Sequence, residues 1–159
     1  MGDSTLATPQ AGTLTVTTTG SGALVFNTGS SLEFDLINAG SGAVNSSDLL
    51  DINGQLTLAS GVTLDVANPN GIANWAFGDS WKLIDWSGVT FTGGSQTSFT
   101  LGTSFDTVLQ GTGYQWDFTK LYTEGVVSIA PEPGRFILLL LGGMSLLLRR
   151  RRSSISTSV

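Results

Sequence analysis

Alternation of apolar and small polar residues is the feature that most limits how this chain can fold. Between positions 12 and 66, Leu14 and Val16 alternate with threonines, and Leu32 and Phe34 alternate with carboxylates. Successive side chains of a strand point to opposite faces, so period two with one polar face is typical of a half-buried strand. This part of the chain therefore predicts strands rather than helices.

Segments containing Gly and Asn separate the alternating runs. Asn53-Gly54 lies between two of them, and both residues tolerate the positive φ that a tight turn needs. The segment Asn68-Pro69-Asn70-Gly71 ends the most regular part, and 72–80 predicts a loop with at most one helical turn. Strands are expected at 13–17, 23–26, 32–36, 49–52, 55–58, 63–66, 81–86, 97–101, 107–109, 115–120 and 126–129.

These segments predict an all-β fold. No helix of any length is indicated before residue 134, and strands that recur at roughly 8 to 12 residues suggest a sandwich, a barrel or a solenoid. Apolar residues recur at 18 to 20 residues, from Leu14 to Leu32 and from Leu36 to Leu56, which is compatible with solenoid rungs. We therefore expect a short parallel β-solenoid, resembling a β-helix, in which the more aromatic second half forms a β-cap, followed by one C-terminal hydrophobic helix.

The charge is divided unevenly along the chain. All 12 carboxylates lie before residue 135, where only Lys82 and Lys120 oppose them, a net charge of about −10. Nucleic acid is therefore not an expected partner, because phosphate binding needs clustered Lys and Arg. The chain has no Cys and no His, which removes thiol chemistry, the commonest general base and the commonest metal ligand. We expect no enzymatic activity, no catalytic residue, no cofactor and no metal.

A basic cluster follows an apolar run near the C-terminus. The run Phe136–Leu148 would form a helix of about 20 Å, shorter than the ~30 Å core of a bilayer, so length alone also allows a buried core helix. An arginine at mid-membrane costs roughly 2.5 to 3.5 kcal/mol, so four in succession should stop transfer on the cytoplasmic side. The four are Arg149, Arg150, Arg151 and Arg152. We expect a membrane helix in contact with lipid, with the body on the opposite side.

Two prolines precede the apolar run, in Pro131-Glu132-Pro133. Each lacks an N–H donor and favours extended geometry in the residue before it. The segment is therefore expected to be extended and accessible to an enzyme that binds a backbone. The alternative is that the prolines only separate a β-domain from a helix.

Together, Pro131-Glu132-Pro133, the short apolar helix and the terminal arginine cluster resemble the PEP-CTERM sorting signal of Gram-negative bacteria. The resemblance implies that an exosortase-type membrane enzyme reads Pro131, Glu132 and Pro133, and that Arg149–Arg152 form the membrane stop. It also implies export, through a precursor anchored in the inner membrane, to the cell surface or extracellular matrix, where exopolysaccharide is a further partner. Members of the family carry a signal peptide, which Met1–Gln10 does not resemble, so we expect the natural chain to begin further upstream.

The body carries a second, more degenerate resemblance. Its segments 30–36 (Ser-Ser-Leu-Glu-Phe-Asp-Leu), 54–58 (Gly-Gln-Leu-Thr-Leu) and 61–66 (Gly-Val-Thr-Leu-Asp-Val) are similar to the C-terminal end of bacterial autotransporter-associated β-strand repeat proteins. This implies a secreted or surface solenoid-like domain without enzymatic activity. The expected organisation is a disordered N-terminus (1–11), a β-rich exported domain (12–129), a linker with the sorting motif (130–135), a membrane helix (136–148) and a basic cytoplasmic tail (149–159).

Two groups of residues offer alternatives to a non-enzymatic surface protein. Glu33 with Asp35, or Asp48 with Asp51, could form a carboxylate pair of a polysaccharide-active enzyme or ligate calcium, although a solvated strand face is the favoured interpretation. Aromatic side chains could instead form a sugar-stacking platform, which would make the body a carbohydrate-binding module on the same anchor, although aromatic residues at alternating strand positions are more often core. These side chains are Trp75, Trp81, Trp86, Trp116, Tyr114 and Tyr122.

Overall fold

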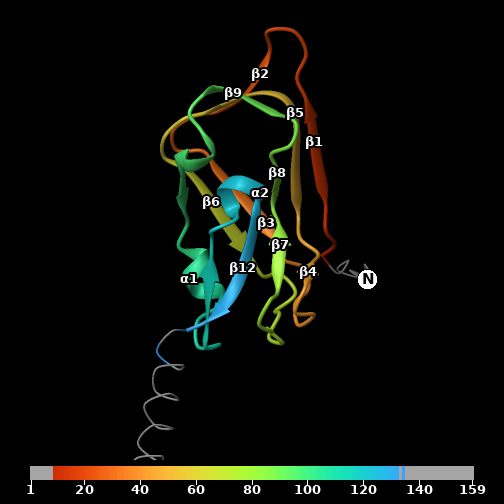
Figure 1. The fold of residues 1–159 in the computed structure, drawn as a ribbon, viewed down its shortest axis with the longest axis vertical. Coiled ribbons are helices and arrows are strands. Elements are labelled where there is room, and N and C mark those ends of the chain that lie inside the picture. The colour runs from red at the N-terminus through yellow and green to blue at the C-terminus, as the bar shows by residue number, and fades with distance from the viewer. Residues whose placement is uncertain (1–8, 133, 135–159) are drawn as a thin grey trace, which may run out of the picture.

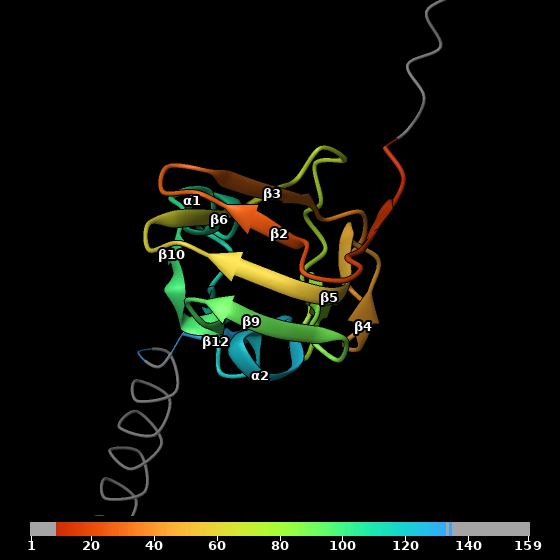
Figure 2. The ribbon, with the colours of Figure 1, turned by 90° about the horizontal axis from the view of Figure 1, so that it is seen from above.

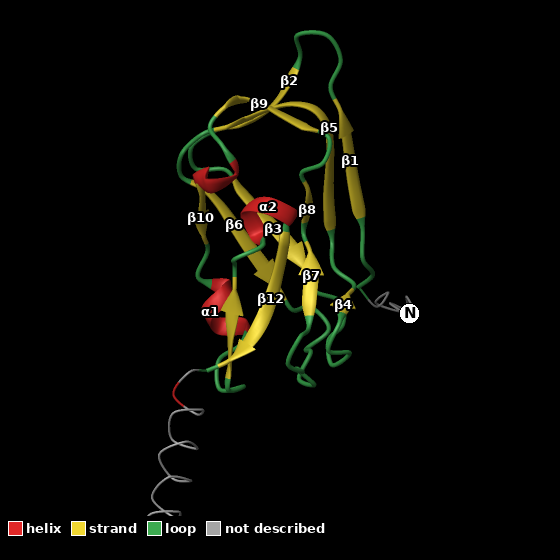
Figure 3. Ribbon diagram, viewed as in Figure 1, coloured by secondary structure: helices red, strands yellow, loops and turns green. Residues whose placement is uncertain are grey.

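The described part of the molecule is an elongated, mostly β structure with a few short helices (Figures 1 and 3). The computed structural model describes residues 9–132 and 134, so Pro133, the apolar run and the arginine cluster lie outside the described residues. The expectation of a mostly β fold is confirmed. The strands are β1 (Thr13–Thr17), β2 (Ala23–Phe26), β3 (Ser31–Asp35), β4 (Val44–Asn45), β5 (Leu49–Leu58), β6 (Val62–Ala67), β7 (Ser80–Lys82), β8 (Ile84–Asp85), β9 (Val89–Gly93), β10 (Phe99–Leu101), β11 (Tyr114–Asp117) and β12 (Val126–Pro131).

The chain makes three successive passes, formed by β1 to β3, by β5 and β6, and by β8 to β10. The strands of successive passes lie side by side and parallel. β1 pairs with the first half of the long strand β5 and β2 with its second half, while β8 and β9 pair with the same two halves. β6 lies between β3 and β10 in a second parallel sheet. Figure 2 shows β2, β5 and β9 next to one another. Each pass therefore forms a layer that pairs with the next.

Paired residues in adjacent layers are 32 to 37 positions apart in the sequence. Leu14 pairs with Leu50, and Leu50 pairs with Ile84, at separations of 36 and 34 residues. The expected spacing of 18 residues instead relates Leu14 to Leu32, which lie in different strands of one layer. That spacing was wrong as a layer-to-layer repeat because one pass contains several strands, so apolar positions recur within it.

Apolar side chains from all three layers meet in one core. Strand β6 shows the alternation plainly, since Val62, Leu64 and Val66 are buried while the residues between them are half-buried. Full burial of such a side chain stabilises a fold by roughly 1.5 to 3 kcal/mol. In the first layer, Leu14 remains 64% exposed because its strand pairs on only one side within the described residues.

Antiparallel strands and short helices pack against the last layer. β12 pairs with β11 on one side and with β7 on the other, in a sheet whose order is β11-β12-β7-β4. The helices are η1 (Gln96–Ser98), α1 (Ser104–Val108) and α2 (Leu121–Glu124). No long helix is present in the described part of the chain. The three short helices were not expected from the sequence.

Several expectations for individual strands differ from the structure. The turn expected at Asn53-Gly54 is wrong, because β5 runs through both residues and joins the strands expected at 49–52 and 55–58. The strand expected at 97–101 begins only at Phe99, after η1, and the strand expected at 115–120 ends at Asp117.

The strand expected at 107–109 is wrong, because this segment belongs to α1 and its C-terminal end, where Phe105 and Leu109, four residues apart on one helical face, are both buried. The strand expected at 81–86 is divided at Leu83. The N–H groups of Leu83 and Ile84 both donate to the carbonyl oxygen of Gly125, at 2.9 and 3.3 Å, which interrupts the strand between β7 and β8.

Candidate functional site

The first two residues of the expected sorting motif lie where the last strand ends. Pro131 is the final residue of β12 and pairs with Tyr114 at the start of β11. The N–H group of Glu132 donates to the carbonyl oxygen of Gly113 at 3.2 Å. Pro131 is half-buried and the Glu132 side chain is exposed. This part of the motif therefore continues the pairing with β11 at the end of the sheet. Pro133 and Arg149–Arg152 lie outside the described residues.

A groove of about 420 Å³ lies beside Glu132. Buried or half-buried apolar side chains and exposed polar ones line it, drawn from α1, from the turn after it and from the segment of β11 and Phe118. Sequence reasoning missed this groove because it assigned the segment containing Asp106 to a strand and a loop. The polar and aromatic lining residues include Asp106, Gln110, Tyr114, Gln115, Trp116 and Glu132.

The tryptophans belong mainly to the core. Trp81 and Trp86 are buried, Trp75 and Trp116 are half-buried, and Trp81 makes edge-to-face contacts with both of the latter. They do not form an exposed row, and Tyr114 and Tyr122 are also half-buried. Three indole N–H groups donate to backbone carbonyls, Trp81 to Asn38 at 2.9 Å, Trp86 to Leu121 at 2.9 Å and Trp116 to Phe105 at 2.7 Å.

Of the carboxylates considered as pairs, Asp48 binds backbone N–H groups. The N–H group of Asp35 donates to Asp48 at 3.2 Å, and that of Gly12 donates to the same carboxylate at 2.8 Å. Burial, together with the nearby Asp48 charge, raises the pKa of Asp35 above its ordinary value. Glu33 lies on the outer side of β3 in register with Asp65 of β6. These contacts favour a structural role for the Asp48 carboxylate.

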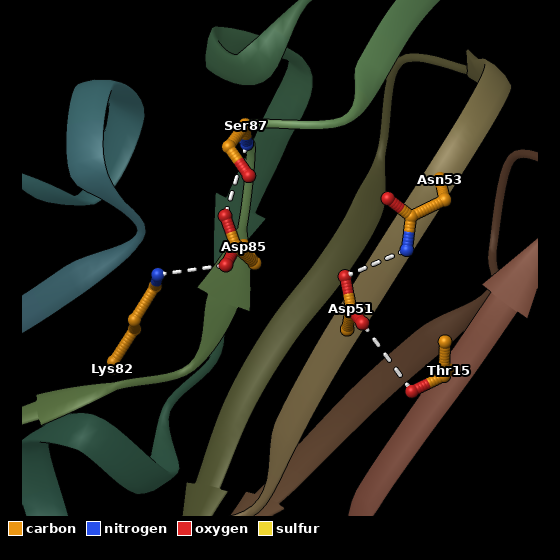
Figure 4. Close-up of polar contacts among 6 residues, drawn as sticks. All are labelled: Thr15, Asp51, Asn53, Lys82, Asp85 and Ser87. Carbon is orange, nitrogen blue, oxygen red and sulfur yellow. Dashed lines mark hydrogen bonds and ion pairs between the residues drawn. The ribbon is translucent and has the colours of Figure 1, made fainter.

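Asp51 faces outward from β5 beside the neighbouring layer (Figure 4). It accepts hydrogen bonds from the Thr15 hydroxyl at 3.3 Å and from the Asn53 side-chain amide at 3.2 Å. Asp85 is its register partner in the next layer. This carboxylate therefore joins outward-facing polar side chains of adjacent layers.

Asp85 forms an ion pair of its own (Figure 4). The Lys82 ammonium lies 2.9 Å from it, and the Ser87 N–H group donates to it at 3.0 Å. These contacts, the Lys82 hydrogen bond foremost, lower the pKa of Asp85 to about 2. Within residues 9–132 and 134, no group of three or more carboxylates is placed to hold a metal ion.

Asp79 is the buried carboxylate that sequence reasoning overlooked. It accepts hydrogen bonds from the backbone N–H groups of Gly40 at 2.7 Å, Gly42 at 2.8 Å and Ala76 at 2.8 Å, and from the Asn45 amide at 2.9 Å. Burial alone would raise the pKa of Asp79, but these donors outweigh it and hold the pKa below its ordinary value. The arrangement fixes two loops to each other rather than presenting a reactive group.

No family model matches the sequence, and comparison with curated proteins and with solved structures gives no significant match. In the part of the chain that the structure describes, no helix is both long enough and apolar enough to cross a bilayer.

Proposed function

We propose that this chain is a non-enzymatic exported protein of the cell surface or biofilm matrix. Its C-terminal segment 131–152 is an exosortase-type sorting and membrane-anchoring signal of the PEP-CTERM kind. The observation that carries the proposal is the position of Pro131 and Glu132 at the exposed end of β12, where the strand pairing of the body stops. An enzyme that binds an extended backbone would meet the motif at the edge of the folded domain.

We further propose that the body is a short parallel β-solenoid with a β-cap. Three layers paired in parallel register, with partners 32 to 37 residues apart, support this architecture. The β11–β12 pair would then be the cap, because β12 adds to β7 in the antiparallel sense. Such a body presents rows of outward-facing polar side chains to a polysaccharide matrix.

Sorting is tested by expressing the chain behind a secretory signal peptide in Gram-negative cells that contain an exosortase-type enzyme. We expect an exported product that lacks the residues after the motif, detected by intact mass spectrometry. Glu132→Ala is expected to abolish this shortening, because it removes the motif's only charged group. Replacing Arg149–Arg152 with alanine is also expected to abolish it, because the membrane stop is lost.

Glu124→Ala is the matched control for this experiment. Glu124 is another exposed glutamate, paired with Lys120 at 3.4 Å on α2, and its replacement should leave shortening unchanged. If Glu132→Ala is shortened as completely as the control, the motif does not carry recognition. If the unaltered chain stays in the membrane at full length, the tail is only an anchor.

The groove beside Glu132 favours a second candidate function, binding of a neutral saccharide by the same exported protein. Half-buried Tyr114 and Trp116 offer apolar ring surface, while Gln110 and Gln115 offer amide groups for hydroxyl groups. The carboxylates of Asp106 and Glu132 accept hydrogen bonds and disfavour an acidic sugar. This groove replaces the exposed row of tryptophans as the place where a sugar would lie.

Saccharide binding is tested on an array of neutral and acidic oligosaccharides. We expect the wild-type chain to retain neutral members, and Asp106→Ala to bind them roughly tenfold more weakly, because a hydrogen bond to a charged group is lost. Glu124→Ala, outside the groove, should bind as the wild type does. Absence of retention on the whole array, or equal binding by both variants, would count against this function.

A further inference from the structure

Near the end of the molecule at which β12 leaves the fold, two segments without charged residues expose two apolar side chains. The two segments lie at this lower end of Figure 1 and are here called the tip loops: 37–45, which ends in the two-residue strand β4, and 68–78. They contain no Asp, Glu, Lys or Arg. Phe77 is 67% exposed and Val44 is 74% exposed. The tip loops therefore expose apolar side chains and carry no charged residue of their own.

The tip loops are held together by hydrogen bonds. Asn74 donates from its side-chain amide to the carbonyl oxygen of Ala39 at 3.0 Å, and Asn70 donates to that of Ile37 at 3.0 Å. Asp79 binds backbone N–H groups from both loops and lies wholly buried behind them. The exposed Phe77 and Val44 are therefore presented by loops whose polar groups bond to one another, which lowers the cost of entering a less polar environment.

The connection to the apolar run brings this end close to a membrane. Only four residues, 132–135, separate the end of β12 from Phe136. Fully extended, they reach about 14 Å. If 136–148 enters a bilayer, as the proposed function requires, the end of the body that carries the tip loops must lie near the bilayer surface (Figure 1).

We infer that the tip loops dock on the lipid bilayer, with Phe77 and Val44 inserted at the boundary between headgroups and acyl chains. Aromatic and aliphatic side chains on uncharged loops suit this layer. The net charge of the body, about −10, would be repelled by an anionic surface, so zwitterionic headgroups are the expected contact. The inference rests on the proposed membrane segment and adds an orientation of the folded domain.

The test uses the full chain, which has no Cys, so a single introduced cysteine carries a fluorophore at one position. Val44→Cys and Val25→Cys are each labelled with the polarity-sensitive dye NBD and reconstituted into phosphatidylcholine vesicles. Val25 is the matched control, since it is 50% exposed on β2, at the opposite end of the molecule (Figure 1). We expect several-fold stronger NBD emission at position 44 than at position 25, and protection of that signal from iodide in the water.

Vesicle flotation separates the two ways in which this result could fail. A chain that floats with the vesicles but gives equal emission and equal quenching at both positions overturns the docking of the tip loops and leaves the membrane segment standing. A chain that does not float overturns both. Adding Phe77→Ser to the Val44→Cys chain should reduce its emission toward that of the control; unchanged emission would contradict insertion of Phe77.

Discussion

Replacing Asp79 with alanine is expected to lower the free energy of unfolding by about 4 kcal/mol. The side chain is fully buried and accepts four hydrogen bonds, three from backbone N–H groups and one from the Asn45 amide. Alanine would leave those donors, which are buried or partly buried, without their acceptor. The same change would release the two tip loops from each other.

Urea unfolding of the full chain, followed by tryptophan fluorescence, measures this loss, because Trp81 and Trp86 are buried and report on the core. Asp106→Ala is the matched control, since Asp106 is an exposed aspartate on α1. It should change stability by no more than about 0.5 kcal/mol. Equal midpoints for the two variants would show that the Asp79 hydrogen bonds contribute no more than a surface carboxylate does.

The pH dependence of the Asp79 contribution has a definite sign. The pKa of Asp79 is lower in the folded protein than its ordinary value of 3.8. Such a group stabilises the fold above its unfolded pKa, and the stabilisation is lost as pH falls through the folded pKa. The gap in unfolding free energy between wild type and Asp79→Ala should therefore be constant from neutral pH to about pH 4 and narrow below it. A gap that narrows between pH 7 and pH 5 would contradict this assignment.

Strands were predictable from the sequence where their signal is local. Alternation in segments such as 62–67 depends only on neighbouring residues, and the buried and half-buried positions follow it. The pairing of layers was not predictable, because the separation of 32 to 37 residues depends on how many strands and turns each pass contains. The turn α1 was missed because Phe105 and Leu109 fit a helical face only once both are known to meet the core.

The candidate site likewise contains residues that the sequence alone indicates and residues that only the fold brings together. Pro131 and Glu132 were predicted as part of the sorting motif from the residues adjacent to them. The groove beside them includes Asp106, which lies near β11 only in the folded chain. Asp79 gave no local signal, because its partners at Gly40 and Gly42 lie 39 and 37 positions earlier. Groups whose chemistry depends on distant partners become visible only when the register of the layers is known.

Gly125 is the second position at which a single substitution is expected to have a large effect. It ends α2 with φ of 72°, in the left-handed region, and its carbonyl oxygen accepts the N–H groups of Leu83 and Ile84. A Cβ atom added here would overlap the carbonyl oxygen of Ile84, which is backbone and cannot turn aside. An alanine at position 125 would therefore push the connection between α2 and β12 away from Leu83 and Ile84. This contact is here called the junction.

Gly111→Ala separates this overlap from simple backbone strain. Gly111 has a similar φ of 77°, but an added Cβ atom would meet nothing within 4 Å, so the cost should be about 1 kcal/mol. Gly125→Ala is expected to cost about 4 kcal/mol in urea unfolding, because strain and overlap combine. If both variants lose the same stability, the junction yields to the added Cβ atom without extra cost, and it is looser than the hydrogen bonds from Leu83 and Ile84 to Gly125 indicate. A larger loss at Gly125 identifies this junction as the point that fixes the strand leading to Pro131.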